Sequence, residues 1–108
     1  MQRKLMLEFR GDGQTIKRKY EFKECMMDSK IHTIRDGRYT SFYPNGDVRE
    51  KKRYREGKLN GRHIKYTKYE GDDDGYTYVM IQAHYFDDVL DGVWKRYYIW
   101  HDGTKYLV

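Results

Sequence analysis

Catalysis needs a nucleophile, a base or a metal cluster at a defined spacing, and this chain offers few such groups. Its only serines are Ser29 and Ser41, and neither lies in the Gly-x-Ser-x-Gly turn that exposes a nucleophile. The four histidines show no metal-ligand spacing, and Cys25 is the only cysteine. No phosphate-binding glycine loop is present. We therefore expect no enzyme, no bound metal and no cofactor.

Binding chemistry is better represented, because basic residues crowd one predicted strand. Side chains alternate across a strand, which places four cations on one face, each about 6.6 Å from the next: Arg49, Lys51, Arg53 and Arg55. The intervening residues of 48–54 fall on the other face. The row is either a docking strip for an acidic protein or a phosphate backbone, or a solvated face that blunts edge pairing. Lys17 and Lys19 share a face of their own strand and would extend the strip.

The elements that position these residues are repeats. Mostly aromatic side chains follow three glycines at the same offsets, two, five and six residues later; the glycines are Gly37, Gly61 and Gly92. A second glycine closes each segment. The lead-in segments 54–61 and 85–92 also match in register, and an insertion of about seven residues near 71–79 lengthens the second repeat.

Glycine turns with strand-like flanks predict hairpins. Asn45-Gly46 and Asp102-Gly103 are strong two-residue hairpin signals, since both positions of such a turn need a positive φ. We predict four antiparallel hairpins, at about 4–22, 38–54, 62–85 and 93–107. Residues 23–36 fit either a longer loop or a distorted strand pair. A lone hairpin is marginal in water, so we expect an all-β fold in which the hairpins stack into one elongated, twisted antiparallel sheet.

A set of aromatic, leucine and glycine positions recurs in register: Gly37, Tyr39, Phe42, Tyr43, Tyr54, Gly57, Leu59, Gly61, Tyr66, Tyr85, Leu90, Gly92, Trp94, Tyr97 and Tyr98. These positions resemble the MORN repeat, in the type 2 variant of bacterial antitoxin-like repeat proteins of the YwqK type. Residues 36–103 carry the resemblance, and 1–35 fit as a divergent N-terminal cap of a single domain, 1–108. The chain departs from the pattern at His63, Thr67 and Asp88.

The resemblance implies a scaffold for protein–protein contact. Some MORN-type repeats have been linked to lipid headgroups, and the YwqK-like group is assigned to toxin neutralisation mainly by association. Small viral and phage proteins also use such repeats. The function implied is a non-catalytic module that masks or inhibits a protein partner, as an antitoxin, immunity protein or phage inhibitor does; a shared fold does not by itself give the function.

Two further groups are candidates for partner contact. Recurring aromatics are expected to be mostly core, with the remainder lining a binding face. Trp100, which has no equivalent in the other repeats and precedes His101, is the best candidate of this kind. The acidic insertion contributes Asp72, Asp73 and Asp74. It lacks the alternating spacing and distal glutamate of a calcium loop, so it is either a solvated loop or a contact element.

Composition narrows the class of partner. The 108 residues carry a net charge of +5 and 17% aromatic residues, which favour a folded β domain with an acidic partner. One cysteine excludes a disulfide-stapled module. No apolar run has the length of a membrane span, and the first residues lack a signal-peptide pattern. We expect a cytoplasmic location and a protein partner, with nucleic acid or anionic lipid as the alternative and self-association through sheet edges as a third option.

Overall fold

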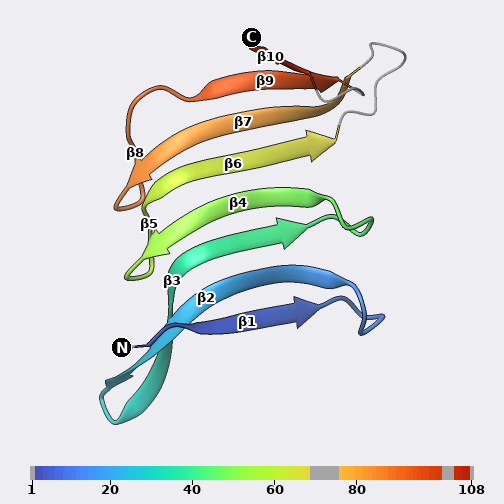
Figure 1. Cartoon of the computed structure of the whole chain (residues 1–108). Coiled ribbons are helices and arrows are strands. Elements are labelled where there is room, and N and C mark those ends of the chain that lie inside the picture. Colours follow the sequence, from blue (N-terminus) through green and yellow to red (C-terminus); the bar gives the residue numbers. More distant parts are fainter. Residues whose placement is uncertain (1, 69–75, 101–103, 108) are drawn as a thin grey trace.

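The computed structural model of the chain describes residues 2–68, 76–100 and 104–107. Every regular element in these ranges is a β-strand (Figure 1). The strands are β1 (Lys4–Phe9), β2 (Ile16–Met27), β3 (Lys30–Phe42), β4 (Val48–Arg55), β5 (Lys58–Leu59), β6 (Gly61–Lys68), β7 (Tyr76–Phe86), β8 (Val89–Leu90), β9 (Lys95–Trp100) and β10 (Lys105–Leu107).

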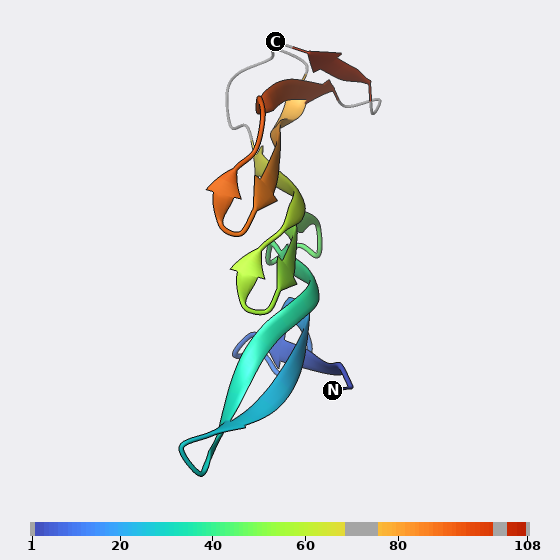
Figure 2. The ribbon, with the colours of Figure 1, turned by 90° about the vertical axis from the view of Figure 1, so that its left-hand side faces the viewer.

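The strands form one antiparallel sheet, with hairpin stacked on hairpin. Their order is β1-β2-β3-β4-β6-β7-β9-β10, while the short strands β5 and β8 pair with β4 and β7. The molecule measures 57 × 39 × 17 Å, and edge-on it is a single twisted layer (Figure 2). The prediction of an elongated, twisted all-β antiparallel sheet is confirmed.

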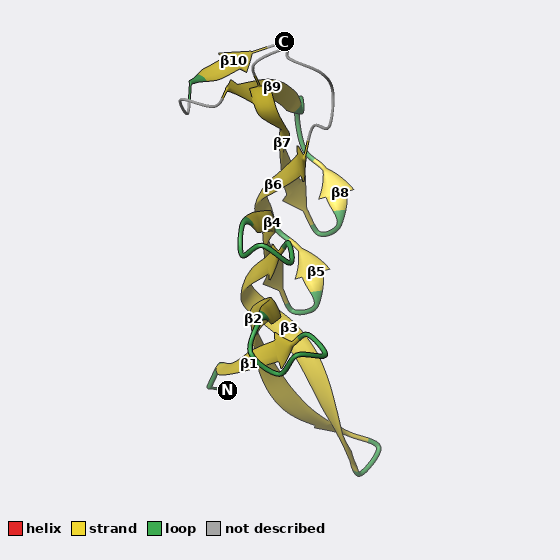
Figure 3. Ribbon diagram, turned by 90° about the vertical axis from the view of Figure 1, so that its right-hand side faces the viewer, coloured by secondary structure: helices red, strands yellow, loops and turns green. Residues whose placement is uncertain are grey.

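Residues 23–36, which the sequence left open between a loop and a strand pair, form paired strands. β2 and β3 pair from Phe22 opposite Arg35 out to Met27 opposite Lys30. This arm projects beyond the rest of the sheet (Figure 2). The tip of the arm, β5 and β8 all lie on the same side of the sheet (Figure 3).

The turns in which both central residues have a positive φ are not the ones that the sequence predicts. Positive φ at both central positions occurs at Asp28-Ser29, Glu56-Gly57 and Asp87-Asp88. The same prediction for Asn45-Gly46 is wrong, because only Gly46 has a positive φ, of 94°. The Gly46 N–H donates to the Tyr43 carbonyl at 2.9 Å, which closes a type I turn followed by a left-handed glycine. Asp102-Gly103 lies outside the described residues.

Asp88, which follows Tyr85 at the offset at which Gly57 follows Tyr54, connects neighbouring hairpins. Its φ is 69°, a conformation that Asp tolerates better than most residues. The Asp88 carboxylate accepts the Leu59 N–H at 2.7 Å, and the Asp88 N–H donates to the Leu59 carbonyl at 2.9 Å. These two hydrogen bonds fasten the β7–β8 turn to β5 of the preceding repeat.

Burial is thin because none of the described residues forms a second layer against the sheet. Among the described side chains, the buried apolar residues are Phe22, Tyr39, Met80 and Ala83. The expectation that the recurring aromatics are mostly core is therefore wrong for most of them. Trp94 is 47% exposed. The half-buried members are Tyr43, Tyr66, Tyr97 and Tyr98.

Candidate macromolecule-binding face

Cross-strand pairing aligns residues into rows that run across the sheet. One row consists of Glu8, Arg18, Ser41, Glu50, Lys65, Ile81 and Arg96. The adjacent row consists of Leu7, Lys19, Thr40, Lys51, Ile64, Gln82 and Lys95. Neighbours along a strand point to opposite faces, so the two rows lie on opposite faces. Charges of both signs occupy the first row, whereas the second holds three lysines and no carboxylate.

The face of the first row carries a cluster that we call the aromatic ladder, made of Tyr20, Tyr39, Tyr54, Arg35 and Lys52. Tyr20 stacks on Tyr39 with ring centroids 5.8 Å apart, and Tyr54 meets Tyr39 edge-on at 6.0 Å. The Arg35 guanidinium lies 5.0, 5.2 and 5.6 Å from the three ring centroids, and Lys52 Nζ lies 4.6 Å from that of Tyr39. Such contacts stabilise the sheet where no second layer exists.

Carboxylates on this face are matched by cations. Glu50 lies 2.9 Å from Lys52 Nζ and 3.1 Å from His63 Nε2. These contacts, chiefly the one with His63, lower the pKa of Glu50 to about 2 although burial opposes the shift. In the same row, Glu8 pairs with Arg18 at 2.9 Å. The cations on this face therefore take part in holding the sheet together.

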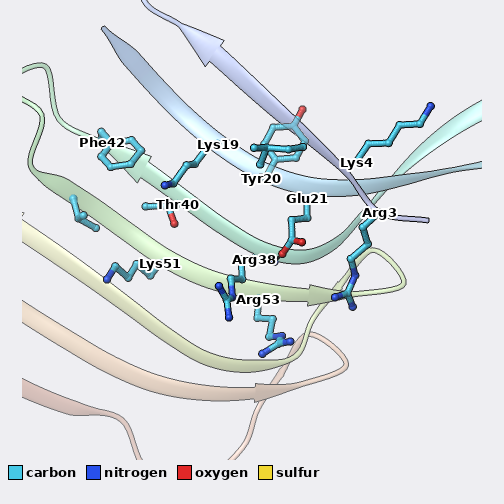
Figure 4. Close-up of a pocket in the computed structure, with 12 residues that line it drawn as sticks. Arg3, Lys4, Lys19, Tyr20, Glu21, Arg38, Thr40, Phe42, Lys51 and Arg53 are labelled. Carbon is cyan, nitrogen blue, oxygen red and sulfur yellow. Dashed lines mark hydrogen bonds between the residues drawn. The ribbon is translucent and has the colours of Figure 1, made fainter. Parts of the chain in front are cut away.

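The opposite face holds an open hollow of about 980 Å³, lined from β1 to β4 (Figure 4). We call it the basic hollow and define it by four cations, Lys19, Arg38, Lys51 and Arg53. Its lining also includes the apolar residues Leu5, Phe42 and Val48. Arg3 and Lys4 line it as well, but each has a carboxylate 2.9 Å away, on Asp36 and Glu24 respectively.

The four cations lack such partners, since none pairs with a carboxylate anywhere in the described ranges. Arg38 and Arg53 stand directly opposite each other on β3 and β4. Lys19 and Lys51 stand on either side of Thr40. Like charges placed opposite each other destabilise a sheet. The hollow therefore presents unmatched positive charge to a ligand.

Glu21 is the one carboxylate in the lining of the hollow, and it is hydrogen-bonded to the backbone. Its Oε1 accepts the Arg38 N–H at 2.8 Å. A Cβ on Gly37 would lie 2.7 Å from that oxygen, and Gly37 has a φ of 113°. Glycine at this position thus permits the close approach that keeps Glu21 bound to the backbone.

The structure divides the predicted basic strip among three sites. Exposure alternates along β4 as predicted, with Arg49, Lys51, Arg53 and Arg55 all exposed. Lys51, Arg53 and Lys19 line the basic hollow. Arg49 and Lys17 instead line a smaller hollow of about 150 Å³ that includes Ser41 and Glu50 of the ladder face. Arg55, like Arg53, lines a hollow that also includes Asp36.

Two β-bulges explain the positions of Arg49 and Lys17. Ser41 pairs with Glu50 and Phe42 pairs with Val48, so Arg49 is an extra residue without an opposite partner. A register shift in the β1–β2 pair leaves Lys17 as an extra residue in the same way. A bulge interrupts strict alternation. The bulges therefore remove Arg49 and Lys17 from the shared face. Arg55 follows Arg53 by two residues without a register shift, so it keeps the predicted face but lines a neighbouring hollow.

Other predicted contacts fall where the chain is not described. Asp72, Asp73, Asp74 and His101 lie outside the described residues, and only the backbone of Trp100 is described. Sequence reasoning missed Arg38. A signal for it existed, because the predicted hairpin 38–54 already brings its two ends together and so places Arg38 beside Arg53.

Within residues 2–68, 76–100 and 104–107, no three His, Cys, Asp or Glu side chains gather where they would hold a metal ion. The same ranges contain no helix with the length and apolarity of a membrane span. Comparisons with models of protein families, with curated proteins and with solved structures gave no match. What the chain does is therefore inferred from its own residues.

Proposed function

We propose that this chain is a non-catalytic binding module that masks an acidic surface of a protein partner. The observation that carries the proposal is the basic hollow, where four cations stand without carboxylate partners among the described residues. The proposal includes MORN-like repeats and a cytoplasmic role of the antitoxin, immunity or phage-inhibitor type. The repeat type and the cytoplasmic inhibitor role rest on the resemblance of residues 36–103 to MORN-type repeats.

The lining of the hollow favours a protein over a bare polyanion. Leu5, Phe42 and Val48 lie among the cations, and Leu5 is 61% exposed. An acidic protein surface with an apolar side chain satisfies both kinds of group, whereas a phosphate backbone satisfies the charges alone. Arginine and aromatic residues are enriched at protein interfaces, and matching charges increase association rates.

Electrostatic binding of nucleic acid or anionic lipid is the second candidate. It is favoured by Lys17 and Arg49, which line the smaller hollow with Arg10 and Arg18 and extend positive charge toward the hairpin loops. Such binding weakens steeply as salt rises, because neutralised phosphates release counterions.

Affinity capture from the native host with matched baits tests the proposal. The hollow variant carries Lys19→Glu, Arg38→Glu, Lys51→Glu and Arg53→Glu. The control variant carries the same charge change outside the described hollows, at Lys30, Lys58, Lys95 and Lys105, all of them exposed. Low-salt and high-salt washes are compared, and protein and nucleic acid are quantified in the eluates.

We expect the native chain and the control variant to retain one stoichiometric protein that the hollow variant loses. Equal retention by all three baits would contradict a role for the basic hollow. Capture of nucleic acid or lipid alone, lost as salt rises, would contradict the protein partner and support the second candidate.

A further inference from the structure

We infer that two copies of this chain pair edge to edge through β1. This strand is the first in the sheet order, so one side of its backbone has no neighbouring strand among those described. It contains neither proline nor glycine and pairs with β2 without a register shift from Lys4 to Glu8. Proteins usually blunt a regular, unpaired edge, because its free N–H and C=O groups recruit another strand.

The side chains of β1 also leave apolar surface exposed on one face. Leu5 is 61% exposed and Leu7 is 42% exposed. They alternate with Met6 and Glu8, which fall on the ladder face, and with Lys4, which also borders the hollow and reaches Glu24 at 2.9 Å. A second strand beside β1 would pack its own side chains against both leucines.

The sequence of β1 selects a copy of itself as that second strand. Lys4-Leu5-Met6-Leu7-Glu8 is symmetrical about Met6, with opposite charges at its two ends. Two copies in antiparallel pairing about Met6 place each Lys4 opposite Glu8 of the other copy. Each Leu5 then lies opposite Leu7 of the other copy. One surface thus complements itself across a two-fold axis, as a closed dimer requires.

Other registers match poorly. A two-residue slip in one direction places Lys4 opposite Arg10 of the second copy, which sets like charges against each other. The same slip in the other direction places Lys4 opposite Met6 and leaves Glu8 opposite Gln2. Only pairing about Met6 places leucine opposite leucine at both positions and opposite charges at both ends of the strand.

The ion pairs within each copy agree with this register. Lys4 lies 2.9 Å from Glu24, and Glu8 lies 2.9 Å from Arg18. Pairing about Met6 joins these contacts into a chain of alternating charge across the interface. That chain would run from Glu24 and Lys4 of one copy to Glu8 and Arg18 of the other. The contacts within each copy therefore need not break when the dimer forms.

A charge swap tests this register directly. Lys4→Glu and Glu8→Lys are prepared as separate single variants, and their masses are measured by sedimentation over a range of concentrations. Each variant alone would place like charges opposite each other at two positions of the interface. We expect its dimer dissociation constant to rise by roughly tenfold or more. An equimolar mixture restores opposite charges, so it should recover the dimer, with twice the 13.3 kDa mass of one chain.

A control and a second measurement keep the test decisive. Lys105→Glu makes the same charge change on β10, the opposite edge, and should leave the dimer intact. Met6→Cys, in a chain that also carries Cys25→Ser, should form an intermolecular disulfide, because paired residues at the axis lie within bridging distance. The inference is overturned by a native chain that stays monomeric, or by a dimer that survives Glu8→Lys. A mixture that stays monomeric overturns it equally.

Leu5 lines the basic hollow and also takes part in the β1 pairing, so the two proposals share one apolar residue. Their tests are nevertheless separate. None of the four cations that define the basic hollow lies on β1. A chain that captures its partner while remaining monomeric would lose only the β1 pairing. A dimer that binds no partner would lose only the proposed function.

Discussion

Lys51 and Lys52 are neighbours on β4, yet they have opposite surroundings. Lys52 lies 2.9 Å from Glu50 and 4.6 Å from the Tyr39 ring centroid, as part of the aromatic ladder. Lys51 faces the basic hollow and pairs with no described carboxylate. Two residues of the same type in adjacent positions thus differ in what they contribute: one to stability, the other to a free charged surface.

A net charge of +5 therefore says little about function until the carboxylate partners of each cation are known. On the ladder face, carboxylates and aromatic rings surround the cations. In the basic hollow, Arg38 and Arg53 stand opposite each other, and neither forms an ion pair with a described carboxylate. Under the proposed function, binding of an acidic partner offsets the cost of these opposed like charges.

The largest effect is expected at Tyr39, the most buried ring of the aromatic ladder. It is 7% exposed, so Tyr39→Ala should lower the free energy of unfolding by about 3 kcal/mol or more. Tyr39→Phe keeps the ring and serves as the control. Urea unfolding followed by circular dichroism measures both variants, and equal stability for Tyr39→Ala and the native chain would mean that the ladder does not support the sheet.

The next effect separates two arginines on β3. Arg35→Met removes the cation over three rings while retaining an apolar stem, and should cost about 1 to 2 kcal/mol. Arg38→Met, on the hollow side, should change stability by less than about 0.5 kcal/mol. Paired unfolding curves measure the difference. The division between the faces would fail if Arg38→Met proved the more damaging substitution.

Acid should weaken the ladder face through Glu50. Folding lowers the pKa of Glu50 from 4.5 to about 2, so its contribution to stability is present above pH 4.5 and is lost as pH falls toward 2. The native chain should therefore exceed Glu50→Gln in stability at pH 7, and the gap should shrink between about pH 4.5 and pH 2. Urea midpoints across this range measure the gap, and a gap that stays constant would show that Lys52 and His63 do not stabilise the ionised form of Glu50.

The smallest effect is expected in the basic hollow. Arg53→Gln removes the like charge opposite Arg38 and should raise the free energy of unfolding by about 0.2 to 1 kcal/mol. The rise should shrink at high salt, because salt screens repulsion between exposed charges. Thermal melts at two salt concentrations check both points. Destabilisation by Arg53→Gln would mean that Arg53 has a structural role.

Much of the architecture follows from the sequence because hairpins are local. The glycine turns and alternating strands of 38–54 and 62–85 locate the pairs β3–β4 and β6–β7 correctly. The bulges could not be predicted from alternation, because an extra residue in one strand changes which residues lie opposite each other and which face they occupy. Lys17 and Arg49 left the predicted strip for this reason.

The site was only partly visible in the sequence. Lys19, Lys51 and Arg53 were predicted as a binding surface, and the structure places them together. Arg35 escaped notice because its contacts depend on 23–36 forming paired strands, which the local pattern left open. The exposure of Trp94 depends on the absence of a second layer, a property of the whole sheet rather than of any segment.

The most direct test of the division between the two faces is the unfolding free energy of one chain with a neutral hollow. That chain carries Lys19→Gln, Arg38→Gln, Lys51→Gln and Arg53→Gln. We predict that it is at least as stable as the native chain, because relief of the repulsion between Arg38 and Arg53 outweighs loss of the contact between Lys19 Nζ and the Phe42 ring centroid, 5.8 Å away. A loss of more than about 2 kcal/mol would contradict the account and place the basic hollow among the elements that hold the sheet together.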